Sequence, residues 1–123
     1  MARIVLAEDE AALRNNLARY LKTLGHDVRT AGNGNEAMTE LGAGPTDVLI
    51  TDINMPDMDG IEILNTLRKQ GSTLPVIAIS GGGQFSKQLL LSSATMLGAL
   101  LTLEKPFALD DLRVALERVL SAP

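Results

Sequence analysis

The sequence predicts an α/β fold, a doubly wound (βα)5 domain in which helices cover both faces of a five-stranded parallel sheet. Short apolar, β-branched runs alternate five times with segments whose apolar residues have helical spacing. Sequential βα units of this length connect parallel strands by right-handed crossovers. The 123 residues correspond to one domain with one core.

The first half of the chain contains three strand-like runs and two helical segments. Residues 3–7 are apolar and end at an acidic loop, as a buried strand does. From Glu10 onward, apolar residues recur at i, i+4, i+7, i+8 and i+11, and Gly25 ends this amphipathic helix. The remaining predicted elements are a strand over 27–31, a brief helix around 36–41, and an apolar strand over 48–50 that leads into Asp52. Gly42, Gly44 and Pro45 are expected to close the brief helix.

The second half continues the alternation and completes the sheet. Turn-forming residues after Asp52 precede a helix marked by Ile63, Leu64 and Leu67. The predicted elements that follow are a strand over 74–79 that ends at Ser80, a glycine loop over 81–83, a helical segment over 85–97, a strand over 100–103 and a final helix over 109–119.

Composition excludes several classes of function. The formal net charge is −4, so no basic surface for direct nucleic-acid binding is expected. Cysteine is absent and His26 is the only histidine, which excludes thiolate catalysis and multi-histidine metal sites and leaves oxygen ligands for any metal. The apolar runs are too short to cross a membrane, and the first residues enter a strand directly, which predicts a cytoplasmic protein.

Charged and polar residues follow four of the predicted strands. Glu8 and Asp9 come after the first strand, and Asp52, Ser80 and Lys105 come after the third, fourth and fifth. In an open parallel sheet these carboxyl ends lie along one edge, where ligands bind. Taken singly, each of these residues also fits a solvated loop. Together, the three acids and the lysine carry a net charge of −3 + 1 = −2, which favours the binding of Mg²⁺. The combination therefore indicates a site for phosphoryl transfer.

These residues resemble the receiver domain of two-component response regulators. The resemblance extends over the whole chain and depends on four segments: 6–10 (LAEDE), 51–60 (TDINMPDMDG), 79–81 (ISG) and 104–107 (EKPF). It implies a flavodoxin-like sheet of order 2-1-3-4-5 and a cis bond between Lys105 and Pro106. The chain is then expected to be a single receiver domain over 1–123, with no output domain.

The resemblance also implies a role for each residue of the site. Asp52 is the expected phosphoacceptor, and Ser80 and Lys105 are expected to bind the phosphoryl group. The expected Mg²⁺ ligands are Asp9, Asp52 and the backbone carbonyl of Asn54, with Glu8 acting through a water. The donor is a phosphohistidine on a sensor histidine kinase or a histidine phosphotransfer protein.

Phosphorylation is expected to act as a conformational switch. Ser80 and Lys105 move toward the phosphoryl group, and the face made by the fourth helix, fifth strand and fifth helix then regulates a downstream protein. Many relatives have an aromatic residue three positions before the lysine, where this chain has Thr102, so an aromatic readout is not expected. The run 89–91 (LLL) is expected to expose one leucine on this face, either for a partner or a homodimer or as an isolated surface residue.

The favoured function is a stand-alone receiver that assists its own phosphorylation and dephosphorylation but is not an enzyme for other substrates. An aspartyl-phosphate phosphatase or phosphotransferase is a second hypothesis, although Asn54 stands where such enzymes place a general acid. A phosphorylation-independent interaction module is a third, but none of the acids nor the lysine is lost. A nucleotide or flavin binder is disfavoured because residues 7–10 (AEDE) offer acids where a phosphate needs glycines.

Overall fold

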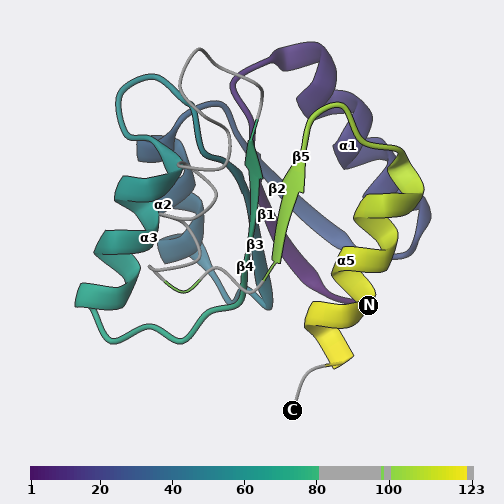
Figure 1. Cartoon of the computed structure of the whole chain (residues 1–123). Coiled ribbons are helices and arrows are strands. Elements are labelled where there is room, and N and C mark those ends of the chain that lie inside the picture. Colours follow the sequence, from purple (N-terminus) through teal and green to yellow (C-terminus); the bar gives the residue numbers. More distant parts are fainter. Residues whose placement is uncertain (81–97, 99–100, 122–123) are drawn as a thin grey trace.

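A computed structural model describes residues 1–80, 98 and 101–121 of the chain. All five predicted strands form one parallel sheet of order β2-β1-β3-β4-β5, which confirms the fold class and the strand order (Figure 1). The elements are β1 (Arg3–Ala7), α1 (Ala11–Thr23), β2 (Asp27–Ala31), α2 (Gly34–Ala43), β3 (Val48–Asp52), α3 (Gly60–Lys69), β4 (Val76–Ser80), β5 (Leu101–Glu104) and α5 (Leu109–Ser121).

The boundaries of several elements differ from the predicted ones. Helix α3 begins at Gly60, earlier than its apolar spacing indicates, because the Asp59 side chain caps it by accepting the Glu62 N–H at 2.8 Å. Asn33 caps α2 in the same way, by accepting the Glu36 N–H at 2.8 Å. The predicted glycine loop over 81–83, the helical segment over 85–97 and its leucine run over 89–91 lie outside the described residues.

Two apolar cores lie on opposite faces of the sheet. Helices α1 and α5 cover one face, and α2 and α3 cover the other (Figure 1). Strand β1 alternates between them, since Ile4 and Leu6 belong to the core under α1 and α5 whereas Val5 and Ala7 belong to the core under α2 and α3. Burial on both faces explains why β1, β3 and β4 are continuous apolar runs.

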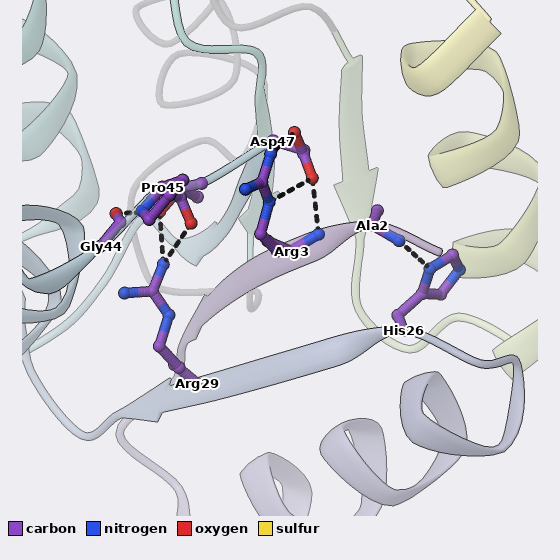
Figure 2. Close-up of polar contacts among 8 residues, drawn as sticks. Ala2, Arg3, His26, Arg29, Gly44, Pro45 and Asp47 are labelled. Carbon is purple, nitrogen blue, oxygen red and sulfur yellow. Dashed lines mark hydrogen bonds and ion pairs between the residues drawn. The ribbon is translucent and has the colours of Figure 1, made fainter.

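Polar contacts fasten the amino end of the sheet, opposite the predicted site (Figure 2). Arg29 of β2 donates to the Pro45 carbonyl at 2.9 Å and to the Thr46 hydroxyl at 2.6 Å, which fixes the loop that follows α2. Arg3 forms an exposed ion pair with Asp47 at 3.2 Å. These contacts set the ends of β1, β2 and β3 relative to one another.

The single histidine lies at this same end of the sheet. His26 Nδ1 accepts the backbone N–H of Ala2 at 3.0 Å (Figure 2). Partial burial, and secondarily the positive chain terminus, lower the pKa of His26 below its ordinary value of 6.5. His26 is therefore a neutral hydrogen-bond acceptor that ties the start of β1 to the residue before β2.

Candidate functional site

The residues singled out from the sequence meet at the carboxyl end of the sheet. Glu8 and Asp9 directly follow β1, Asp52 and Ser80 are the last residues of β3 and β4, and Lys105 directly follows β5. Because all five strands are parallel, their carboxyl ends lie at one edge. The expected convergence of distant segments is present in the structure.

Three carboxylates form a tight cluster in this site. Glu8, Asp9 and Asp52 each place one oxygen within 4.8 Å of the oxygens of the other two. Glu8 and Asp52 are only 1% and 3% exposed, whereas Asp9 is exposed. The cluster therefore has two buried acids and one that faces solvent.

One ammonium group bridges the two buried acids. Lys105 Nζ lies 2.7 Å from Glu8 Oε1 and 2.7 Å from Asp52 Oδ2. Burial alone would lower the pKa of Lys105, but hydrogen bonds to Asp52 and Glu8 and their negative charge outweigh it and raise the pKa. Lys105 is consequently a fixed positive charge between two carboxylates, and its peptide bond to Pro106 is cis, as the resemblance implies.

Backbone N–H groups engage the remaining oxygens of the buried acids. The Asn54 N–H donates to Asp52 Oδ1 at 3.1 Å, and the Glu10 N–H donates to Glu8 Oε2 at 3.0 Å. Sequence reasoning missed both donors, because every residue except proline carries this group and no sequence pattern marks it. Asn54 thus lies beside Asp52, but a role of its carbonyl in metal binding stays a prediction.

The hydroxyl of Ser80 has no partner among the described residues. Ser80 is fully buried at the end of β4, and its Oγ is the buried side-chain atom in that part of the chain that lacks a hydrogen bond. A buried hydroxyl without a hydrogen bond costs free energy. This hydroxyl is therefore available to a group that enters the site.

The donor set of the cluster fits Mg²⁺. The three acids and Lys105 carry a net charge of −3 + 1 = −2. Loss of solvation, and secondarily a hydrogen bond to Glu8 and the charge of its carboxylate, raise the pKa of Asp9, the direction expected where negative charges are crowded. Carboxylate oxygens are the ligands that Mg²⁺ prefers, so a hard divalent cation would relieve this repulsion.

Gly60 lies against the backbone of Asp52, and the sequence alone did not predict this contact. A Cβ at Gly60 would lie 2.5 Å from the carbonyl oxygen of Asp52 and 2.9 Å from the Ile53 Cα. The Gly60 N–H also donates to the Ile53 carbonyl at 2.9 Å. This contact packs the start of α3 directly against the backbone that carries Asp52, which leaves no space for a side chain.

Thr102 lies on the same face of the sheet as Ser80. It is paired with Ala78 in the parallel ladder between β4 and β5, and Ser80 follows Ala78 by two residues. Side chains two residues apart on a strand point to one face. Thr102 is partly exposed, so the structure places a small hydroxylated side chain on the edge strand of this face.

Comparison with known proteins identifies the family. The family model for the response regulator receiver domain matches residues 4–117. The chain is 36% identical over 116 residues to the sensor protein EvgS of Escherichia coli and 33% identical over 118 residues to the response regulator MprA of Mycobacterium avium. It covers 9% of EvgS and 50% of MprA, so it spans half or less of the length of these curated relatives.

Solved structures agree with the family match. The crystal structure of the receiver domain of NtrX from Brucella abortus superposes with a TM-score of 0.88 at 32% identity, over 98% of this chain and 99% of that one. The chain therefore belongs to the response regulator receiver domain family of two-component signalling. Within the described ranges, no helix has the length and apolar character that a membrane crossing requires.

Proposed function

We propose that the protein accepts a phosphoryl group on Asp52 in the cytoplasm, from a phosphohistidine of a sensor histidine kinase or a histidine phosphotransfer protein. The observation that carries this proposal is the buried Asp52 carboxylate, which shares Lys105 with Glu8 and lies beside Asp9. An ordinary structural ion pair needs one acid for one lysine. The surplus of negative charge is understandable if a cation binds beside these acids, since an incoming phosphoryl group adds further negative charge.

Phosphoryl transfer to this site is a displacement at phosphorus. An oxygen of Asp52 forms a bond to phosphorus while the bond between phosphorus and the donor's imidazole nitrogen breaks, and the nitrogen keeps the electron pair. Lys105 is placed to neutralise oxygens of the transferring group, and the unpaired Ser80 hydroxyl can donate to another. Attack of water on the aspartyl phosphate later releases inorganic phosphate and restores Asp52.

The residues around Asp52 would also hold Mg²⁺. Asp9, Asp52 and the Asn54 carbonyl would be direct ligands, with Glu8 acting through a water. The bound ion supplies positive charge that lowers the repulsion between the carboxylate nucleophile and the phosphoryl oxygens. The protein's own residues fix the nucleophile, since both oxygens of Asp52 already accept hydrogen bonds.

The response to phosphorylation is a change of conformation that regulates a partner protein. Movement of Ser80 and Lys105 toward the phosphoryl group would act on β4 and β5. Thr102 of β5 lies on the same sheet face as Ser80. The downstream partner then binds the expected face, of which the structure describes β5 and α5. The predicted fourth helix over 85–97 lies outside the described residues. Since Thr102 carries no ring, we expect the small side chain to let this face change without the rotation of an aromatic group.

The mass of the intact protein tests the proposal. With phosphoramidate and Mg²⁺, the wild type should gain one phosphoryl group, and chelation of Mg²⁺ should prevent the gain. Asp52→Asn should remain unmodified, whereas Asp57→Asn, which removes an exposed acid from the same loop, should react like the wild type. A wild type that stays unmodified with Mg²⁺ present, or an Asp52→Asn variant that still gains the group, would refute the proposal.

A second variant separates acceptance from response. In Lys105→Ala, the phosphoryl group should be accepted slowly, because Asp52 can still attack but the ammonium that neutralises the incoming group is gone. The phosphorylation-induced changes in the NMR spectrum should be lost with it. Spectral changes equal to those of the wild type would contradict the role of Lys105 in the switch.

A further inference from the structure

We propose that Glu8 is a positioning residue that holds Lys105 in place for the phosphoryl group. This inference deepens the proposed function and rests on it. It assigns to Glu8 a main effect on the lysine, where the resemblance implies an effect on the metal through water. The two assignments give different results in the experiment below.

The first observation is the symmetry of the lysine's contacts. Lys105 Nζ is 2.7 Å from Glu8 and 2.7 Å from Asp52, so both contacts are charge-assisted hydrogen bonds. An ammonium group has three N–H donors. Two of them are engaged here, and the third is left for an oxygen of the entering phosphoryl group.

The second observation is that Glu8 is itself held rigidly. Its backbone N–H donates to the Ala31 carbonyl at 3.0 Å, and its backbone carbonyl accepts from Arg14 Nη1 at 2.9 Å. Its Oε2 accepts the Glu10 N–H at 3.0 Å, and the residue is 1% exposed. A carboxylate fixed at backbone and side chain can act as a stable reference point for Lys105.

Both side-chain oxygens of Glu8 are therefore already engaged, one by Lys105 and one by Glu10. Asp9 is exposed beside them and is the acid that is open to a cation from solvent. The geometry separates two tasks. Asp9 is the acid that is open toward solvent for a metal ion. Asp52 is engaged at both oxygens, as Glu8 is, but one of those oxygens becomes bonded to phosphorus, and Glu8 then retains the lysine.

The main test variant is Glu8→Gln, which keeps the length of the side chain and removes its charge. The reaction with phosphoramidate, followed by intact mass at a series of donor concentrations, should slow about tenfold or more, the loss expected for one charge-assisted hydrogen bond. Mg²⁺ affinity, measured by calorimetry, should fall far less than in Asp9→Asn. Glu10→Gln is the matched control, because it removes the neighbouring exposed acid and should react like the wild type.

A double-mutant cycle shows whether Glu8 acts through the lysine. In the Lys105→Ala background, Glu8→Gln should cause little further loss of rate, because the group that Glu8 positions is absent. The variant Glu8→Asp keeps the negative charge, but its side chain is about 1.5 Å shorter, so it should also slow the reaction. A wild-type rate in Glu8→Asp would overturn the proposal. Circular dichroism confirms that each variant is folded.

The outcomes distinguish this inference from the proposed function. If the wild type reacts at Asp52 but the Glu8 and Lys105 effects are additive, Glu8 does not act through Lys105 and the inference fails alone. Equal losses of Mg²⁺ affinity in Glu8→Gln and Asp9→Asn would also overturn it, in favour of a role at the metal. If the wild type is never phosphorylated, the proposed function fails first.

Discussion

Replacement of Asp9 by asparagine should make the metal-free protein more stable. Asp9 lies within 4.8 Å of the carboxylate oxygens of Glu8 and Asp52, and Lys105 compensates only part of the combined negative charge. Asparagine has nearly the same shape and no charge. The variant therefore removes repulsion from the cluster while it leaves the pair of Lys105 with the two buried acids intact.

The distance sets the size of this effect. The carboxylate oxygens lie at most 4.8 Å apart, and two unit charges at that limit repel by about 3 kcal/mol at an effective dielectric constant of about 20. Asp9 repels two acids and is attracted by one lysine, which leaves roughly one such interaction. Because Asp9 is exposed, solvent screening reduces the net gain to about 1 kcal/mol, which corresponds to a rise of about 4 °C in Tm for a domain of this size.

Thermal unfolding with and without Mg²⁺ measures this effect. In a chelator, Asp9→Asn should unfold at a higher temperature than the wild type. With Mg²⁺ in large excess the order should reverse, because binding stabilises the wild type and the variant has lost a ligand. Glu10→Gln changes the net charge equally and should shift neither curve; an Asp9→Asn variant no more stable than the wild type in chelator would refute the repulsion argument.

Two further perturbations address packing and pH. Gly60→Ala should lower the free energy of unfolding in urea by about 2 kcal/mol, because its Cβ would lie 2.5 Å from the Asp52 carbonyl oxygen. Gly42→Ala is the control, since open space surrounds the new Cβ and the substitution should not destabilise the protein. Equal effects of the two substitutions would contradict the close contact at Gly60. His26 has a lowered pKa in the folded protein, so protonation favours the unfolded chain: the stability is present in full above pH 6.5 and decreases as the pH falls through 6.5 toward the lower folded value. Urea unfolding at several pH values should show this loss in the wild type and not in His26→Asn. An identical pH profile in both proteins would exclude His26 as its source.

Most of the fold could be predicted because its signals are local. Strands buried on both faces are uninterrupted apolar runs, and β1, β3 and β4 were visible for that reason. The apolar spacing of Ile63, Leu64 and Leu67 marks α3 but does not define its start, because the first residue depends on the cap at Asp59. The boundary thus follows from a side-chain hydrogen bond and not from periodicity.

The composition of the site could be predicted, but its pairing could not. The alternation of strands and helices placed Glu8, Asp9, Asp52 and Lys105 at one edge, and the structure brings them together. The sequence does not indicate which acid binds the lysine, because three carboxylates are equally plausible partners on charge alone. The contact between Lys105 and Glu8 joins residues 97 positions apart and depends on the fold.

The most direct test of the central claim is the location of the phosphoryl group in the wild-type protein. After reaction with phosphoramidate and Mg²⁺, the acyl phosphate can be trapped by hydride reduction and located by peptide sequencing. The reduced residue should be Asp52 alone, which shares Lys105 with Glu8. A label at Asp9, or at an exposed acid such as Asp57 with Asp52 unmodified, would contradict the claim that this cluster presents Asp52 as the acceptor.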